Sequence, residues 1–156
     1  MTPRKKTTLV VCAALCVLMT GCSHKPAQPS PTASPTKERT TATGSVPGHH
    51  RALVEKFVAA INAGDKSATR DTFDPAARFD SVGRIYQGVE DIMSRFLVPE
   101  VIEAGGRYEL LSLTASPGER VVAEYDFSTA GGGRERFTYD CAVRAGRFHD
   151  CVGRYV

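Results

Sequence analysis

The sequence predicts an α+β fold for residues 48–156, with helices first and an antiparallel sheet afterwards. The first half of this region carries apolar residues at helical spacing, whereas the second half alternates apolar and polar residues between turn signals. Helices followed by a run of strands are typical of α+β domains. The region has 109 of the 156 residues, which is enough for one modest hydrophobic core.

The chain begins with a segment typical of an export signal. Arg4, Lys5 and Lys6 precede an apolar run over residues 7–20, "TTLVVCAALCVLMT". This run is too short to cross about 30 Å of hydrocarbon, but it suits the central part of a secretory signal peptide. A short buried helix is the alternative, and the basic start argues against it. We therefore expect residues 1–21 to be a signal peptide.

The signal ends in "LMTGC", which resembles the lipobox of bacterial lipoproteins, with Met19 where leucine is commoner. The resemblance implies lipidation of Cys22 and cleavage after Gly21. Two or three acyl chains hold a protein firmly on a membrane, whereas one chain binds only marginally. We therefore expect the membrane as a partner, reached through the lipid on Cys22, and a location on the extracytoplasmic side of the cell membrane.

Removal of residues 1–21 changes the apparent charge of the protein. The chain has 20 Lys and Arg residues against 17 Asp and Glu residues, and three of the basic residues lie in the signal. The mature chain would therefore be formally neutral. Nucleic-acid-binding domains carry clustered positive charge, so nucleic acid is not expected as a partner.

Residues 22–47 are rich in Pro, Ser and Thr, and Val46 is the only large aliphatic residue among them. Such a segment buries too little apolar surface to offset its ordering entropy. We expect a disordered tether between the lipid and the domain, with a glycosylated stalk as the alternative.

Three helices are expected in the first half of the domain. Apolar residues at 53, 54, 57, 58 and 61 form one helical stripe, which Gly64 would end. Asp65 would cap a second helix over residues 66–73, broken by Asp74 and Pro75. A strand over "ARFDSV" and a loop over residues 83–88 follow. The third helix, "VEDIMSRFL", is expected to end near Pro99, with "EVIEA" as one possible further turn.

Four strands are expected in the second half: "RYELLSLTA", "RVVAEYDFS", "ERFTYDCAV" and "RFHDCVGRY". In the last hairpin, a three-residue loop over 145–147 would set Cys141 opposite Cys151, whereas a two-residue loop would set them diagonally. Directly opposed residues are close enough to form a disulfide, and we predict one between Cys141 and Cys151. The alternatives are two free thiols or a metal-binding pair.

This arrangement, with "AAINAGD", "FDSVG", "GVEDIMSRF" and "YDCAVRAGRFHD", resembles the nuclear transport factor 2 superfamily, which includes SnoaL-like proteins and ketosteroid isomerase. The resemblance implies a cone-shaped fold, in which N-terminal helices pack on a curved, mainly antiparallel sheet of four to six strands around an apolar cavity. Core and cavity wall merge in this fold. The residues expected to line the pocket are Phe57, Ile61, Phe79, Ile92, Phe96 and Leu97.

The same resemblance implies candidate catalytic residues. Asp80 in "FDSVG" matches the general base of ketosteroid isomerases, and Asp140 in "YDCAV" matches their protonated hydrogen-bond donor, a pairing that is a known example of pKa tuning. Asp140 would look into the cavity if the disulfide is peripheral. The position of the family's tyrosine donor is Phe57, which has no hydroxyl. Both aspartates could instead line a non-catalytic pocket or serve structural roles.

These observations favour a lipid-anchored, extracytoplasmic protein that binds a small apolar ligand or an envelope partner, without catalysis. The alternative is an isomerase or cyclase that uses Asp80 as base and Asp140 as hydrogen-bond donor. A homodimer formed through the sheet is a third expectation. We expect no cofactor. We also expect no metal, because the tandem histidines His49 and His50 precede the first helix and should point to different faces.

Overall fold

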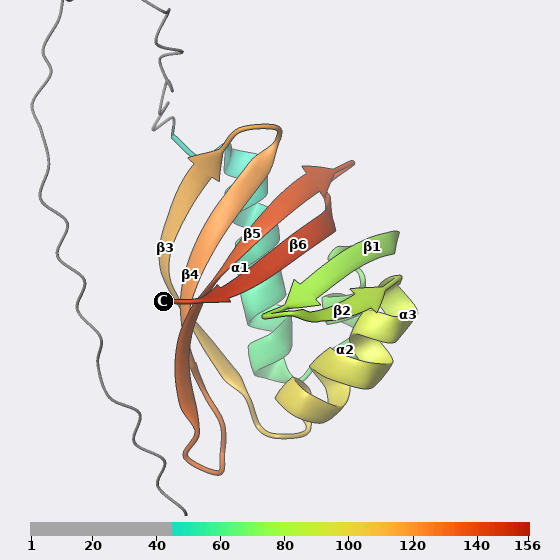
Figure 1. Cartoon of the computed structure of the whole chain (residues 1–156), viewed down its shortest axis with the longest axis vertical. Helices are drawn as coiled ribbons and strands as arrows, with labels where there is room; N and C mark the ends of the chain where they lie inside the picture. Colours follow the sequence, from blue (N-terminus) through green and yellow to red (C-terminus); the bar gives the residue numbers. More distant parts are fainter. Residues whose placement is uncertain (1–44) are drawn as a thin grey trace, which may run out of the picture. The chain divides into compact units, whose positions relative to one another are not determined.

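A computed structural model describes residues 45–156 (Figure 1). The predicted signal peptide, Cys22 and nearly all of the predicted tether lie outside the described residues. Among residues 45–156, no helix combines the length and the apolar character needed to span a bilayer.

The described region contains helices in its first half and most of its strands in its second half. In chain order the elements are α1 (Gly48–Ala63), α2 (Lys66–Arg70), β1 (Phe73–Ser81), β2 (Arg84–Gln87), α3 (Val89–Ile92), the π-helix η1 (Met93–Ile102), β3 (Arg107–Ser116), β4 (Arg120–Ser128), β5 (Arg134–Arg144) and β6 (Arg147–Tyr155).

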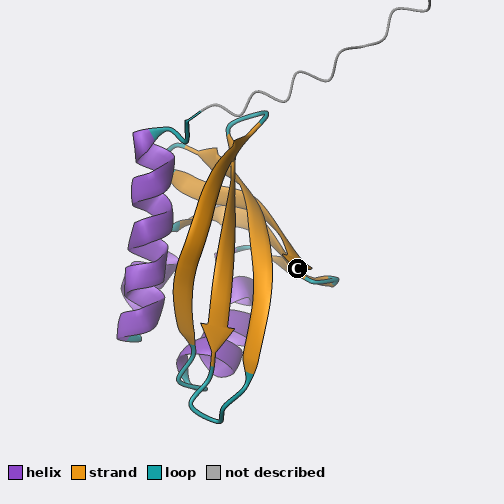
Figure 2. Cartoon of the chain, turned by 90° about the vertical axis from the view of Figure 1, so that its left-hand side faces the viewer, coloured by secondary structure: helices purple, strands orange, loops and turns teal. Residues whose placement is uncertain are grey.

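The strands form one six-stranded sheet in the order β2-β1-β6-β5-β4-β3. All neighbouring strands are antiparallel except β1 and β6, which are parallel. The strands β3 to β5 are long and curved, and α1 lies along one face of the sheet (Figure 2). The α+β class and the helices-then-sheet order expected from the sequence are thus confirmed.

Helix α1 forms where the apolar stripe predicted it. Its buried residues include Leu53, Val54, Phe57 and Ile61, one helical face that packs on the sheet. Gly64 ends the helix in the left-handed conformation, with φ of 70°, which glycine adopts at no steric cost. This burial, rather than helix propensity, holds α1 in place.

Two predictions near β1 are wrong. The second helix is capped by Asp65 as expected, but it ends at Arg70, and Asp74 and Pro75 lie within β1. The ladder between β1 and β6 is irregular between Phe73 and Arg78, so Pro75 has no ladder hydrogen bond to break. The loop predicted over residues 83–88 contains the strand β2. A strand of only four residues is too short to show a recognisable alternation of apolar and polar residues in the sequence.

The third helix does not end near Pro99 but continues into "EVIEA", the segment predicted as one possible further turn. After one α-helical turn in α3, the chain continues as η1, and Pro99 lies inside that helix. In an α-helix the proline ring clashes with the carbonyl four residues earlier. The wider π turn relieves this clash, so the helix carries Val101 into the core before it ends at Ile102.

The last hairpin pairs Cys141 with Cys151 as predicted, but its loop differs from the predicted three-residue loop. Ala145 and Gly146 form a two-residue loop, because Arg144 pairs with Arg147. The register then shifts by one residue at a bulge between Ala142 and Val143, which brings Cys141 directly opposite Cys151. The two cysteines form a disulfide.

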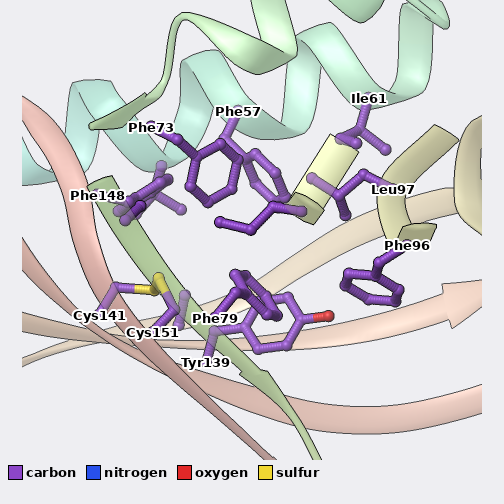
Figure 3. Packing of buried hydrophobic residues seen from close by; sticks show 14 of the residues in the cluster. Phe57, Ile61, Phe73, Phe79, Phe96, Leu97, Tyr139, Cys141, Phe148 and Cys151 are labelled. Carbon is purple, nitrogen blue, oxygen red and sulfur yellow. A yellow bond between two sulfur atoms is a disulfide. The ribbon is translucent and has the colours of Figure 1, made fainter. Parts of the chain in front are cut away.

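The core lies between the helices and the inner face of the sheet and is rich in aromatic rings. Phe57 makes edge-to-face contacts with Phe73 and Phe148, each with ring centroids 5.8 Å apart. The disulfide packs in this core, since Cys141 is 5% exposed and Cys151 is 1% exposed (Figure 3).

Candidate functional site

A pocket with a volume of about 210 Å³ lies where the turn between β1 and β2, the helix η1 and the strands β3 to β6 meet. Half of the residues that line it are aromatic, and charged side chains stand at its rim. The lining residues are Ser81, Val82, Arg84, Phe96, Glu100, Val101, Tyr108, Phe127, Glu135, Phe137, Tyr139 and Tyr155. We call this pocket the aromatic cavity.

Two buried tyrosine hydroxyls lie in the wall of the aromatic cavity. The oxygens of Tyr108 and Tyr139 are 3.3 Å apart, and either can donate to the other. Burial raises the pKa of both phenols well above the usual range, so both stay neutral at physiological pH. One of their two protons serves the mutual hydrogen bond, which leaves the other for an acceptor on a ligand.

The sheet places Tyr139 by means of a glycine. Tyr139 on β5 pairs with Gly153 on β6. A Cβ atom at Gly153 would lie 3.0 Å from Cε1 of Tyr139 and 3.1 Å from the backbone oxygen of Asp80. Only a glycine leaves room there for the ring. Figure 3 shows the Tyr139 hydroxyl on the side of the ring that faces Phe96.

Helix α1 places Tyr108 through Asn62. The Asn62 side-chain amide donates to the backbone oxygen of Tyr108 at 2.8 Å and accepts from its backbone nitrogen, also at 2.8 Å. The side chain thus replaces a neighbouring strand at the start of β3. This contact gives the asparagine of "AAINAGD" a structural role and fixes Tyr108 relative to the core.

The rim of the cavity carries an ion pair. Arg84 donates to both carboxylate oxygens of Glu100, at 2.8 and 2.6 Å, and these hydrogen bonds raise the arginine pKa. The guanidinium carbon also lies 5.7 Å from the ring centroid of Phe96. Bidentate pairs of this kind have a fixed geometry. Glu135 is a further exposed carboxylate at the rim.

The structure places Asp80 on the sheet face opposite the core. Its neighbour Phe79 is buried in the core, so Asp80 points the other way. One oxygen accepts from the backbone nitrogen of Gly83 at 2.7 Å, and the other lies 3.3 Å from Arg78. Asp80 therefore stabilises the turn between β1 and β2 and is not among the residues that line the aromatic cavity.

Asp140 lies on the same outer face. It was expected to look into the cavity if the disulfide were peripheral, but the disulfide is in the core, so alternation turns Asp140 outwards. Its carboxylate accepts from Arg120 at 2.7 Å, and its backbone oxygen accepts from the same guanidinium. Burial alone would lower the pKa of Arg120, and the bonds to Asp140 and Asp150 raise it.

These groups form one network across the outer face. Asp150 lies between two guanidiniums, 3.2 Å from Arg78 and 3.1 Å from Arg120. The network thus connects Asp80 to Asp140 through two arginines and one further aspartate. It occupies the face through which a homodimer is predicted, and that dimer stays a prediction.

Of the six predicted pocket residues, Phe96 lines the aromatic cavity. Ile61 lines a more open hollow between the end of α1 and the turn that precedes β3. Phe57, Phe79, Ile92 and Leu97 are buried in the core. Phe57 nevertheless makes an edge-to-face contact with Tyr108, at 5.8 Å between ring centroids.

Sequence reasoning missed the residues that give the cavity its polar character. Tyr108 and Tyr139 were not among the predicted pocket residues, and neither were Arg84, Glu100 and Glu135. The signal that could have found Tyr139 is its alternation with Cys141, since both face the core. The expectation that His49 and His50 point apart is wrong, because both approach Glu119.

Solved structures share this fold. A proposed polyketide cyclase of Sinorhizobium meliloti is 25% identical, with a TM-score of 0.59, over 66% of this chain and 94% of its own. The Bal32a protein of a soil-derived mobile gene cassette is 23% identical, with a TM-score of 0.61, over 69% and 88%. A proposed ketosteroid isomerase of Kribbella flavida is 14% identical, with a TM-score of 0.60, over 69% and 78%.

The comparison with curated proteins found no match. A family model described as the SnoaL-like domain matches residues 54–150, which include most of α1, the sheet up to Asp150 and both tyrosines of the cavity. The chain therefore belongs to the SnoaL-like family and has the nuclear transport factor 2-like fold.

Proposed function

We propose that the protein is lipid-anchored on the extracytoplasmic side of the membrane and binds a small, flat, mainly apolar ligand in the aromatic cavity, without catalysis. The observation that carries the proposal is the pair of neutral hydroxyls of Tyr108 and Tyr139 in an aromatic wall. A pocket with apolar walls and a few convergent polar groups is the usual form of a small-molecule site.

The dimensions and chemistry of the cavity limit the ligand. Its volume of about 210 Å³ is below the range of roughly 300–1,000 Å³ that is usual for drug-sized ligands, which favours one or two rings over a steroid. Aromatic walls favour a planar body. The free proton of the tyrosine pair favours a carbonyl, ether or phenol oxygen at the inner end of the ligand.

The catalytic alternative, an isomerase or cyclase, draws support from the Sinorhizobium protein, which is described as a proposed polyketide cyclase. It needs Asp80 as base and Asp140 as hydrogen-bond donor at one substrate. A general base must lie within hydrogen-bond reach of the proton it removes. Both carboxylates instead contact arginines on the outer face, so we favour binding without chemistry.

Ligand binding is tested with the full chain and a set of one- and two-ring aromatic ketones and phenols, followed by NMR shifts of tyrosine ring signals. We expect binding that weakens about 10-fold in Tyr139→Phe, which removes a hydroxyl to which a ligand would bond. Tyr125→Phe is the matched control, since Tyr125 is buried but does not line the cavity. Failure of every compound to bind would favour an envelope protein as the partner.

The catalytic alternative is tested separately with Asp80→Asn and Asp140→Asn. If the protein converts any compound of the set, and either variant slows that reaction at least 100-fold with the fold intact, catalysis replaces the binding proposal. Unchanged behaviour of both variants supports structural roles in the outer-face network.

The anchor is tested in cells that express the full chain. We expect the wild-type protein to incorporate a labelled fatty acid and to sediment with membranes, and Cys22→Ser to do neither. Cys16→Ser is the control, because Cys16 would be removed with the signal peptide. Equal labelling of wild type and Cys22→Ser would refute the anchor.

A further inference from the structure

Two histidines and a glutamate from distant parts of the chain meet at the start of the domain. His49 and His50 lie in the first turn of α1, and Glu119 lies in the turn between β3 and β4. One ligand atom from each of the three lies within 4.8 Å of the others. We propose that these residues bind a divalent transition-metal ion, with Zn²⁺ as the best match.

The state of His50 is the observation that points to a ligand. The residue is 1% exposed, and neither ring nitrogen has a hydrogen-bond partner within residues 45–156. The Nε2 atom lies 3.5 Å from a carboxylate oxygen of Glu119, which is too far for a hydrogen bond. A buried polar group without a hydrogen-bond partner destabilises the folded state. A metal ion between the two side chains would remove this cost.

The burial of His50 leaves its ring nitrogens available to a metal ion. Both nitrogens are shielded from solvent and lack a hydrogen-bond partner in the described part of the chain. Metal binding requires a neutral imidazole with a free lone pair. Neutral imidazoles are the commonest metal ligands in proteins.

The other two residues approach His50 from different elements. The ring centroids of His49 and His50 are 4.3 Å apart. Glu119 has a φ of 55°, and its backbone oxygen accepts from the Val143 nitrogen at 2.9 Å, which fixes the turn. The Glu119 side chain is 76% exposed and His49 is exposed as well, so an ion can enter from solvent.

The types of ligand atom at the site favour zinc over other divalent ions. Two imidazoles and a carboxylate match zinc, which binds nitrogen at about 2.0–2.1 Å and carboxylate oxygen at about 2.0–2.2 Å, with water in the fourth position. Tetrahedral ligands at those lengths are about 3.3 Å apart, so small side-chain rotations complete the site. Mg²⁺ and Ca²⁺ prefer oxygen ligands and are not expected to bind here.

The test is isothermal titration of Zn²⁺ into the full chain carrying Cys12→Ser, Cys16→Ser and Cys22→Ser, so that no free thiol competes. We expect one equivalent to bind and the melting temperature to rise, because the ion binds only the folded site. His49→Ala and Glu119→Gln change exposed ligands without removing core volume. Each should weaken zinc binding at least 10-fold.

Glu55→Gln is the matched control, an exposed acid on α1 outside the cluster, and should bind zinc as the parent does. The signals of the His49 and His50 rings in NMR spectra should shift on addition of zinc but not of Mg²⁺. Absence of binding at millimolar zinc would overturn the proposal, as would equal affinity in His49→Ala, Glu119→Gln and the parent.

Discussion

Val82 occupies a backbone conformation that its side chain disfavours. It has a φ of 52° and forms a two-residue turn with Gly83, since Ser81 pairs with Arg84 across the hairpin. Such a turn requires positive φ at both central residues, and a β-branched residue there is a true outlier. The hydrogen bond from Gly83 to Asp80 helps to hold the turn. Val82 also lines the aromatic cavity, so the strain lies at the proposed binding site.

We predict that Val82→Asn raises the free energy of unfolding by about 1 kcal/mol, because asparagine tolerates the left-handed region in which valine is strained. Urea unfolding measures the change. Ile85→Asn is the control, since Ile85 is also exposed and apolar but does not have positive φ, and it should give no gain. A loss of stability in Val82→Asn would show that the valine contacts outweigh the strain.

Some features of single residues could be predicted from the sequence, and others could not. The pair Cys141 and Cys151 could be predicted, because the two cysteines fall near opposite positions in one hairpin. The orientation of Asp80 and Asp140 could not. The alternation of side chains along a strand shows which residues share a face of the sheet. Which of the two faces meets the core depends on the helices, which lie elsewhere in the chain.

At the scale of elements, the hairpin of β5 and β6 joins the two parts of the sheet. β6 pairs with β5 on one side and with β1 on the other, and the disulfide cross-links β5 to β6 in the core. This hairpin therefore connects Tyr139 on β5 to β1, the strand that leads into the strained turn at Val82.

We predict that the double variant Cys141→Ala, Cys151→Ala lowers the free energy of unfolding by about 2–3 kcal/mol, the loop-closure effect for a separation of 10 residues. Denaturant unfolding under non-reducing conditions measures this loss. Reduced wild-type protein should match the variant more closely than the oxidised protein does. Equal stability of variant and oxidised wild type would contradict a stabilising disulfide.

Element prediction succeeded where local pattern and packing agree and failed where packing overrides the pattern. Helix α1 and strands β3 to β6 carry long periodic patterns, and all five form at the expected places. The failures are short or contain proline. Pro99 is tolerated in η1, and Pro75 in β1, because of backbone geometry that no local pattern shows.

At the scale of the molecule, the core and the aromatic cavity are one continuous aromatic assembly. Tyr139 contacts Phe79 at 4.9 Å between ring centroids, and Tyr108 contacts Tyr125 at 5.4 Å. Such contacts join residues far apart in sequence, so composition could predict an aromatic core but not which hydroxyls would be buried. Four tyrosines are nearly inaccessible to solvent, and burial raises the phenol pKa of three of them: Tyr108, Tyr125 and Tyr139.

These three phenols make the folded state sensitive to alkali. Burial raises the pKa of all three above the unfolded value of 10. Below pH 10 both the folded and the unfolded chain keep the three phenol protons. The contribution of these tyrosines to the free energy of unfolding is therefore fully present there. Above pH 10 the unfolded chain releases the protons and the folded chain retains them. The free energy of unfolding must therefore fall as the pH rises.

We predict a loss that approaches about 4 kcal/mol per pH unit well above pH 10, about 1.4 for each tyrosine. Urea unfolding between pH 8 and about pH 11, roughly one unit past the model phenol value, measures it. Tyr125→Phe should reduce the slope by about a third, because it removes one of the three phenols without changing the residues that line the cavity. Tyrosinate absorbance of the buried rings should appear together with unfolding. Ionisation of these rings in the still-folded protein would contradict their burial, and with it the neutral hydroxyl pair on which ligand binding is proposed to depend.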